Sequence, residues 1–200
     1  KYQYIEELKS FIKTMKSRRK KEFQPFTIEE EIKEVTKYRN FKPETLEHFK
    51  LGYVENVKLK KRDGNNYTLL HRLVFPIFFN NIQVGISFRR TNSNDIPKWS
   101  HQPAHIETKE ILYNYDNIKN SKVIVVCEGI TDVWAFHEIG VSAVATFGAH
   151  ITQEQYKLLL KTGADLVFAY DGDEAGQLAT KHALKMFKYK ANLSVLHLND

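Results

Sequence analysis

Two short apolar runs that each end in acidic residues constrain this chain most. The run at 123–127 leads directly into Glu128, and the run at 166–170 leads into Asp171 and Asp173. Both runs are rich in β-branched or aromatic residues and lack polar alternation, which is typical of strands buried on both faces of a parallel sheet. Ligands of open α/β sheets bind at the carboxyl ends of the strands, where acids from two strands can converge on a hard divalent cation. The pattern therefore predicts metal-assisted chemistry on phosphates.

A divalent metal ion is the expected counterion of this acidic edge. One glycine separates Asp171 from Asp173, so a sharp turn can direct both side chains to one point. Asp132 follows Glu128 by four residues and lies on the same face if a helix begins at once. Four carboxylates at one edge repel one another unless cations compensate. We therefore expect Mg²⁺ or Mn²⁺ at Glu128, Asp171 and Asp173. For Asp132, two roles stay open: metal ligand, or first-turn acid that stabilises the helix dipole.

Charge is divided unevenly along the 200 residues. Residues 1–62 carry 17 Lys and Arg against 10 acidic residues, whereas residues 121–200 carry 7 against 9. A basic front half beside an acidic pocket suits a polyanion held by one part and a metal-bridged phosphate handled by the other. For the first 40 residues, lysines that only keep helices soluble are an equally good explanation.

The cysteine content and the apolar runs limit the class of protein. The single Cys127 excludes a disulfide framework and a cysteine-based zinc site. Its place within an apolar run indicates a buried, unreactive thiol in a reducing compartment. No apolar stretch approaches the length that spans a bilayer. We expect a soluble, cytoplasmic protein with no membrane partner.

The predicted secondary structure changes character along the chain. An amphipathic helix over about 2–22 and a second helix, opened by a capping box at 27–30 and ending near 39, come first. A short helix near 43–49 and an antiparallel meander follow. After residue 122, strands and helices alternate, which implies a parallel sheet with right-handed crossovers. The meander strands are expected at 54–60, 68–79 and 83–90, with irregular chain around Pro97 and Pro103. The later strands are expected near 123–127, 142–146, 165–170 and 193–198, and the later helices near 131–139, 152–161 and 174–187.

The acidic motifs resemble those of a known family. EGITD at 128–132 followed by DGDEAG at 171–176 resembles the Toprim module, which primases, topoisomerases and some nucleases share. ATFGA with ITxxQ at 145–155 resembles the stretch that DnaG-type bacterial and phage primases have between these motifs. Upstream, further segments resemble successive motifs of the primase RNA polymerase domain, in the same order. They lie at 49–53, 72–77, 84–89, 97–100 and 109–113, so the resemblance covers about residues 41–200.

The resemblance implies a fold and an activity. The implied fold is α/β: a Toprim-like parallel sheet with flanking helices, preceded by a smaller mixed α+β basic subdomain and N-terminal helices. The implied segments are 1–40 (helical), 41–116 (basic subdomain) and 117–200 (Toprim metal-binding domain, truncated at its C-terminal end). The implied enzyme is a DNA primase, a DNA-directed RNA polymerase that makes short RNA primers from ribonucleoside triphosphates by metal-assisted nucleotidyl transfer.

The same resemblance assigns roles to residues and names partners. Glu128, Asp171 and Asp173 are the expected catalytic residues, and with Asp132 they form the expected metal site. The basic residues expected to contact nucleotide or template phosphates are Arg72, Arg89, Lys98 and Lys109. The expected partners are a single-stranded DNA template, ribonucleoside triphosphates and a replicative helicase, either fused or separate. The Lys- and Asn-rich sequence favours a phage or low-GC bacterial source.

The sequence departs from the family pattern at three points, and two functions of other classes also stay open. Ser87 and Phe88 replace the small residues usual before Arg89, no Cys/His zinc module precedes the core, and the sequence stops where the family has another acidic motif. A nuclease with the same acidic edge would cleave DNA rather than extend a primer. A non-catalytic DNA-binding module would bind without the acids. His101 and His105 are expected to be exposed loop histidines rather than a metal pair, because Pro103 separates them.

Overall fold

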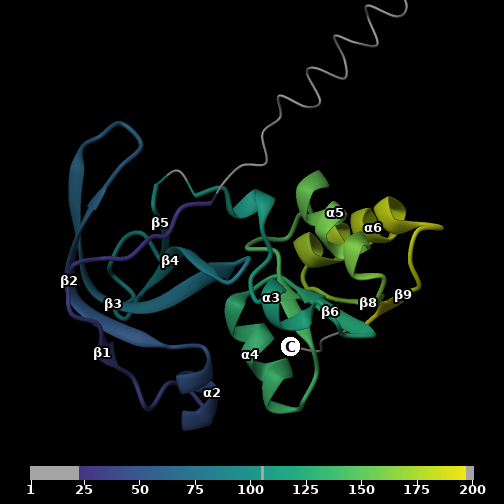
Figure 1. Ribbon diagram of the computed structural model, residues 1–200, viewed down its shortest axis with the longest axis horizontal. Coiled ribbons are helices and arrows are strands. Elements are labelled where there is room, and N and C mark those ends of the chain that lie inside the picture. The colour runs from purple at the N-terminus through teal and green to yellow at the C-terminus, as the bar shows by residue number, and fades with distance from the viewer. Residues whose placement is uncertain (1–22, 105, 197–200) are drawn as a thin grey trace, which may run out of the picture.

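Two β-sheets lie side by side in this chain (Figure 1). The structure is a computed structural model that describes residues 23–104 and 106–196. In these residues, a five-stranded antiparallel sheet has the order β1-β2-β3-β4-β5, and a four-stranded parallel sheet has the order β7-β6-β8-β9. The expected α/β class, with an antiparallel part followed by a Toprim-like parallel sheet and its helices, is confirmed. The helix expected over residues 2–22 lies outside the described residues.

The antiparallel sheet is a meander, and its β2–β3 and β3–β4 hairpins turn between the strands that the sequence predicted. Its strands are β1 (Lys33–Glu34), β2 (Gly52–Lys60), β3 (Asn66–Phe79), β4 (Ile82–Arg90) and β5 (Trp99–Gln102). Gly64 in the first hairpin loop has a φ of 85°, and Asn80 and Asn81 in the second have φ values of 54° and 61°. Glycine and asparagine are the residues that tolerate this left-handed conformation in tight hairpins.

Residues 27–39 form no helix, which corrects the prediction made from the capping box. Lys33 and Glu34 instead form the edge strand β1 against β2. Glu30, which was expected in the first helical turn, accepts a hydrogen bond of 2.9 Å from the backbone N–H of Lys58. These contacts hold the segment along the edge of the sheet, so tertiary pairing overrides the local helix signal.

A second correction concerns the stretch around the two prolines, which was expected to be irregular. Residues 99–102 form β5, whose pairing with β4 places Trp99 opposite Arg89. Pro97 and Pro103 flank this strand and do not interrupt it. Since proline is tolerated just outside an edge strand, the two prolines mark the limits of β5 rather than its absence.

The parallel half alternates strands and helices in the predicted order. Its strands are β6 (Val123–Cys127), β7 (Ala143–Ala145), β8 (Asp165–Ala169) and β9 (Leu193–Val195). Its helices are α4 (Ile130–Glu138), α5 (Gln153–Thr162) and α6 (Glu174–Phe187). A capping box opens α5, where the Gln155 N–H donates to Thr152 Oγ1, and Gly163 ends the helix with a φ of 66°. Three short pieces precede β6: α2 (Pro43–His48), η1 (Thr108–Glu110) and α3 (Tyr115–Ile118).

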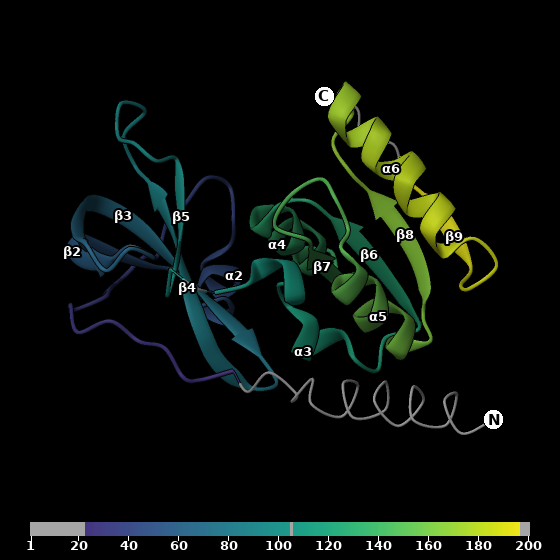
Figure 2. The same cartoon turned by 90° about the horizontal axis from the view of Figure 1, so that it is seen from above.

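The central strand β6 is covered on both faces. Ile124 and Val126 belong to one apolar core with residues of α5 and α6, whereas Val125 and Cys127 belong to another with residues of α4. Figure 2 shows helices on both sides of the parallel sheet. Cys127 is fully buried, and this burial raises the pKa of its thiol. The expected burial of this cysteine is therefore confirmed, and its low reactivity stays a prediction.

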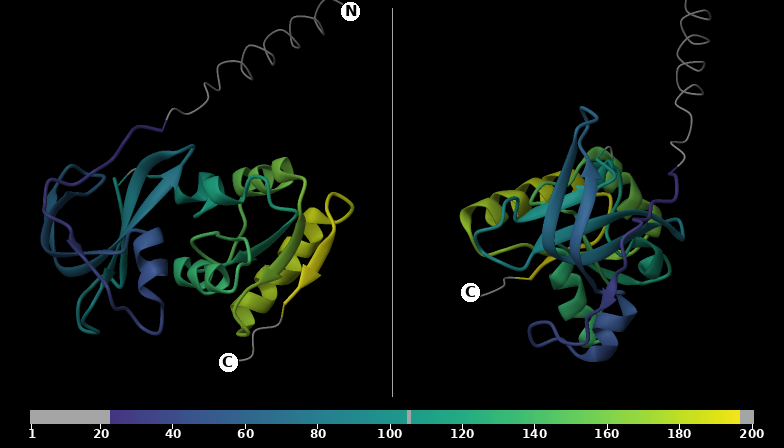
Figure 3. Two further views of the ribbon diagram at one scale, coloured as in Figure 1. Left: turned by 60° about the horizontal axis from the view of Figure 1, so that its bottom comes forward. Right: turned by 90° about the vertical axis from the view of Figure 1, so that its left-hand side faces the viewer.

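The two sheets share a packed junction, with α4 between them (Figure 2 and Figure 3). The fully buried ring of Trp134 in α4 lies 5.2 Å from that of Phe75 in β3 and 5.4 Å from that of Phe49. The Trp134 indole N–H donates to the hydroxyl of Tyr113 at 3.1 Å, and Tyr113 forms a backbone bridge with Ala145. These contacts fix the antiparallel sheet relative to the parallel one. Among the described helices, none is long and apolar enough to cross a membrane.

Candidate metal centre and nucleic-acid interface

The acidic motifs meet at one edge of the parallel sheet, as the sequence predicted. Strands β6 and β8 are parallel neighbours, with Cys127 opposite Ala169. Glu128 follows the end of β6 directly, and Asp171 and Asp173 follow the end of β8. Glu128 is half-buried, and the two aspartates are exposed. All three side chains therefore reach solvent at the carboxyl ends of adjacent strands.

The electrostatics show that these carboxylates are close enough to affect one another. Burial raises the pKa of Glu128 from its usual value, and the negative charges of Asp171, Asp173 and Asp132 raise it further. The pKa of Asp132 is also raised, first by burial and then by Asp171, although its hydrogen bond with Gly129 opposes the shift. His150 lowers the pKa of Glu128 and Arg39 lowers that of Asp132, but these are the smallest contributions, so negative charge dominates this edge.

Two of the acids also hold the first turns of helices. The carboxylate of Asp132 accepts the Gly129 N–H at 3.0 Å, and that of Asp173 accepts the Gly176 N–H at 2.8 Å. Asp132 therefore does have the first-turn role that the sequence left open. Among the described residues, no three His, Cys, Asp or Glu side chains are placed to hold one metal ion together. For these acids to share one ion, their side chains would have to rotate. Asp132 and Asp173 would then have to leave the helix-capping positions described above.

Glycines in both motifs make room for the acids. A Cβ on Gly176 would lie 2.1 Å from the backbone oxygen of Asp171, so the turn carrying Asp171 can pack on α6 only if residue 176 is glycine. A Cβ on Gly129 would lie 2.8 Å from Oδ2 of Asp132. The glycines thus belong to the geometry of the acidic edge.

The expected basic residues differ in their exposure. The Arg89 guanidinium lies over the Trp99 ring, 5.0 Å from its centroid, and is partly exposed. Lys98 and Lys109 are exposed, the first in the loop before β5 and the second in η1. Arg72 is only 2% exposed. Its Nη1 donates to the backbone oxygen of Pro97 at 2.8 Å, so it supports the loop that carries Lys98.

A pocket of about 250 Å³ connects the acidic edge to β5. Glu128 lines it together with Trp99 and His101 from β5 and Phe147 from the loop after β7. The rings of Trp99 and His101 are nearly parallel, with centroids 6.4 Å apart, and the Phe147 ring meets His101 edge-on at 5.7 Å. Aromatic rings beside acids and a guanidinium form a surface suited to a nucleotide.

His101 is not the exposed loop histidine that the sequence analysis expected. It lies within β5, is only partly exposed, and its Nδ1 shares a hydrogen bond of 2.7 Å with the hydroxyl of Ser87. Burial lowers the pKa of His101, which favours the neutral imidazole. His105 lies outside the described residues. In the sequence, the alternation of Trp99 and His101 with Ser100 indicates a strand. The neighbouring Pro97 and Pro103 instead favoured the prediction of an irregular loop.

Comparison with known proteins agrees with this arrangement. Residues 125–200 match the family model described as Toprim-like. The chain is 34% identical over 136 residues to the DNA primase of Campylobacter jejuni, covering 62% of this chain and 22% of that protein. The DNA primase of Haemophilus influenzae is 29% identical over 186 residues, covering 78% of this chain and 31% of that protein. The chain corresponds to the catalytic core of DnaG-type DNA primases, with its Toprim domain. It spans less than a third of the length of these two curated relatives.

Solved structures share the fold of this primase core. The E. coli primase catalytic core superposes with a TM-score of 0.65 at 22% identity, covering 80% of this chain and 63% of that one. A DnaG primase catalytic domain bound to single-stranded DNA gives a TM-score of 0.64 at 23% identity, covering 78% of this chain and 62% of that one. The likeness extends over both sheets because it includes four fifths of this chain.

Proposed function

We propose that this chain performs the chemistry of a DnaG-type primase, namely DNA-templated synthesis of short RNA primers from ribonucleoside triphosphates by nucleotidyl transfer. One observation carries the proposal: Glu128 and Asp171, from two separate motifs, are electrostatic neighbours at the carboxyl ends of adjacent parallel strands. The pocket beside Glu128 adds an aromatic wall with Arg89 over Trp99. The curated relatives named above are DNA primases, which supports the same activity.

A divalent ion fits the residues present at this edge. Carboxylate oxygens are the ligands that Mg²⁺ and Mn²⁺ prefer, and the repulsion that raises the pKa of Glu128 is what a bound cation would relieve. Toprim domains typically bind divalent metal. We assign Glu128, Asp171 and Asp173 as the ligands, with Asp132 joining them or holding the first turn of α4. When bound, such an ion neutralises the charge that develops on the triphosphate during transfer.

The side chains of the site have separate roles in the proposed reaction. Beside its role as a ligand, Glu128 is our candidate for accepting the proton of the attacking 3′-hydroxyl, because it is the carboxylate that lines the pocket with Trp99 and His101. Arg89, Lys98 and Lys109 contact phosphates of the nucleotide or the template. Arg72 contributes through the Pro97–Lys98 loop, which its guanidinium holds in place. Single-stranded DNA, which one solved DnaG catalytic domain binds, is the template.

The proposed function also implies roles for the segments of the chain, a partner protein and a cellular compartment. We assign residues 41–116 to a basic subdomain and residues 117–200 to a metal-binding domain. The third expected segment, 1–40, is not proposed as helical, because residues 27–39 form no helix. A replicative helicase, fused or separate, is the partner that opens the template. The protein acts in the cytoplasm, and the Lys- and Asn-rich sequence favours a phage or low-GC bacterial source.

Replacing one acid tests the proposed chemistry. The variant Asp171→Asn keeps the size of the side chain but removes its charge, so primer synthesis on single-stranded DNA should disappear. Asp165→Asn is the matched control, because Asp165 begins β8 at the opposite edge of the sheet and should leave synthesis intact. Synthesis that persists in Asp171→Asn would refute the assignment. DNA cleavage by the wild type without primer extension would indicate a nuclease, and binding without either reaction would indicate a binding module.

A further inference from the structure

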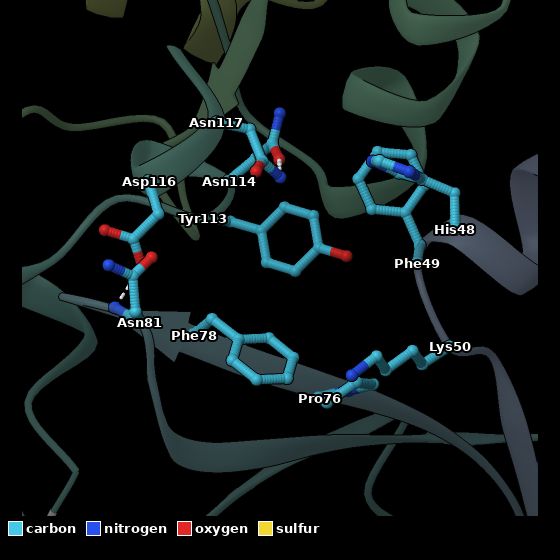
Figure 4. A pocket seen from close by; sticks show the side chains of 10 residues that line it. All are labelled: His48, Phe49, Lys50, Pro76, Phe78, Asn81, Tyr113, Asn114, Asp116 and Asn117. Atoms are coloured by element: carbon cyan, nitrogen blue, oxygen red, sulfur yellow. Dashed lines mark hydrogen bonds between the residues drawn. The ribbon is translucent and has the colours of Figure 1, made fainter. Parts of the chain in front are cut away.

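A second pocket lies at the junction of the two sheets and shares no lining residue with the pocket beside Glu128. Its volume is about 330 Å³, and it is lined by the end of α2 and the two residues after it, by β3 and the turn that follows it, and by the chain around α3. Figure 4 shows Tyr113 in the middle of the lining side chains, with Phe78 and Lys50 on one side and Asn114 and Asn117 on the other. A partly open pocket of this size suits a small molecule rather than a protein segment.

Lys50 is the unusual residue of this pocket. It follows α2 with a φ of 52°, and the hydrogen bonds from Lys50 N–H to Glu47 O and from Leu51 N–H to Leu46 O, both 2.9 Å, form a Schellman motif. Glycine is the usual residue at this position because other residues are strained there. The Lys50 ammonium lies 5.0 Å from the Phe78 ring centroid, and none of the described carboxylates forms an ion pair with it.

The rim opposite Lys50 is held rigid by Asp116. Its two carboxylate oxygens accept the backbone N–H groups of Asn80 and Asn81 at 3.0 and 2.8 Å, and Lys119 pairs with it at 2.7 Å. The charge of Asp116 is therefore already compensated, and the β3–β4 hairpin is fixed against α3. A rim that is ordered before binding loses little entropy when a ligand enters.

Hydrogen-bonding groups on this rim remain available to a ligand. Asn114 donates its amide to Ala143 O at 2.9 Å, and Asn117 donates to Asn114 Oδ1 at 2.7 Å. Within the described part of the chain, the side-chain oxygen of Asn117 and the side-chain amide of Asn81 form no hydrogen bond. Both residues line the pocket. They present the paired donor and acceptor groups with which asparagine reads the edge of a base.

The remaining charge of the pocket favours an anion. His48 lines it and stacks on His137, with ring centroids 4.3 Å apart. Burial lowers the pKa of His48, and the neighbouring His137 lowers it further, so His48 is neutral at pH 7. With Asp116 paired to Lys119, the Lys50 ammonium is the charge left facing the pocket.

We propose that this junction pocket binds a purine mononucleotide. The base lies on the partly exposed ring of Phe78, its edge meets the amides of Asn81 and Asn117, and its phosphate meets the Lys50 ammonium. The Phe78 ring supplies a flat stacking surface, the buried Tyr113 ring forms the apolar floor, and the ammonium supplies a charge-assisted hydrogen bond to phosphate. This site is independent of the primer-synthesis chemistry, because no acid of the metal edge takes part.

The test compares AMP with adenosine, using calorimetric titration of the whole chain in EDTA. Without divalent metal the acidic edge repels phosphate, so it does not compete for AMP. AMP should bind saturably and at least about tenfold more tightly than adenosine, because only AMP reaches Lys50 with an anion. Lys50→Ala should weaken AMP binding by about tenfold and leave adenosine binding unchanged. Lys188→Ala is the matched control, since that exposed ammonium also lies over a ring, 4.9 Å from the Tyr189 centroid.

A second variant separates binding from folding. Lys50→Gly relieves the left-handed strain, so its melting temperature should equal or exceed that of the wild type while AMP affinity falls as in Lys50→Ala. Saturable AMP binding that persists in Asp171→Asn keeps this result distinct from any result on primer synthesis. The proposal is overturned if AMP does not saturate the wild type, if AMP and adenosine bind equally, or if Lys50→Ala behaves like Lys188→Ala.

Discussion

The two sheets supply the candidate site with opposite charges, and they do so by different routes. The parallel sheet gathers its acids at strand ends, because parallel neighbours such as β6 and β8 finish at the same edge. The antiparallel sheet gathers Arg89 and Trp99 by cross-strand pairing, which depends on the register of β4 and β5. The parallel direction of β6 and β8 therefore places the acids at one edge. Arg89 and Trp99, in contrast, lie opposite each other only in one register of β4 and β5.

The same comparison applies to stability. Burial, and then repulsion by the other acids, raise the pKa of Glu128 in the metal-free protein, so ionised Glu128 lowers the stability of the fold. Arg89, in contrast, rests on the Trp99 ring in a favourable cation–π contact. Removing an acid should therefore harm activity and help stability, whereas removing Arg89 should not help stability.

The largest expected effect comes from Glu128→Gln. We expect primer synthesis to fall by at least about 100-fold, because a ligand of the cation that stabilises the transition state is lost. The metal-free melting temperature should rise at neutral pH, since the variant lacks the repulsion. Calorimetry in EDTA and a primer-extension assay measure the two effects. Glu154→Gln on the exposed face of α5 is the control for both. A lower metal-free melting temperature in Glu128→Gln would contradict the claim that the acids of the parallel sheet destabilise the fold.

Gly176→Ala should have the next largest effect. Its Cβ would lie 2.1 Å from the backbone oxygen of Asp171, so the acidic turn and α6 must move apart. We expect a loss of about 1–3 kcal/mol in the free energy of unfolding, together with reduced primer synthesis. Denaturant unfolding checks the first value. Ala175→Ser, at the exposed neighbouring position, should change little, and a Gly176→Ala protein as stable as the wild type would show that the turn does not need glycine.

Arg89→Ala tests the basic side of the comparison. If its guanidinium contacts one phosphate, nucleic-acid binding should weaken, and the slope of log K against log salt should become less steep by about 1. Fluorescence titrations with single-stranded DNA at several salt concentrations give this slope. Lys157→Ala on α5 should leave it unchanged. An unaltered slope in Arg89→Ala would remove Arg89 from the proposed phosphate surface.

Asp132→Asn should have the smallest effect, and it tests whether the pKa of Asp132 is raised at the acidic edge. Because the pKa of Asp132 is raised in the folded protein, metal-free stability should fall as pH rises from the ordinary carboxyl range through that raised value. An amide oxygen can still accept the Gly129 N–H, so the cap survives and the free energy of unfolding should change by less than about 1 kcal/mol. Its pH dependence should be shallower than that of the wild type. A steeper dependence would contradict the raised pKa.

The acidic half of the fold could be predicted from the sequence because its signals are local. An apolar run such as 123–127, a capping box at Thr152 and a glycine at 163 each specify their own element, and the elements alternate regularly. Once strands and helices alternate, the parallel topology places Glu128 and Asp171 together. The positions of these acids thus follow from order along the chain.

The rest depended on contacts between distant segments, which local patterns do not report. Residues 27–39 carried a helix signal but pair along a sheet edge, and β5 formed between two prolines that suggested a loop. Arg72 was expected at a phosphate-binding surface, yet it is buried, with its Nη1 bound to Pro97 O. In each case the deciding partner lies far away in sequence or is fixed by strand register.

Anomalous scattering from crystals soaked with Mn²⁺ and a ribonucleoside triphosphate tests the central claim most directly. That claim is that acids from β6 and β8 form one metal site. We predict Mn²⁺ peaks bound by Glu128 together with Asp171 or Asp173, with the triphosphate on the side of Arg89. Mn²⁺ bound away from these residues, or to one strand end alone, would contradict the account.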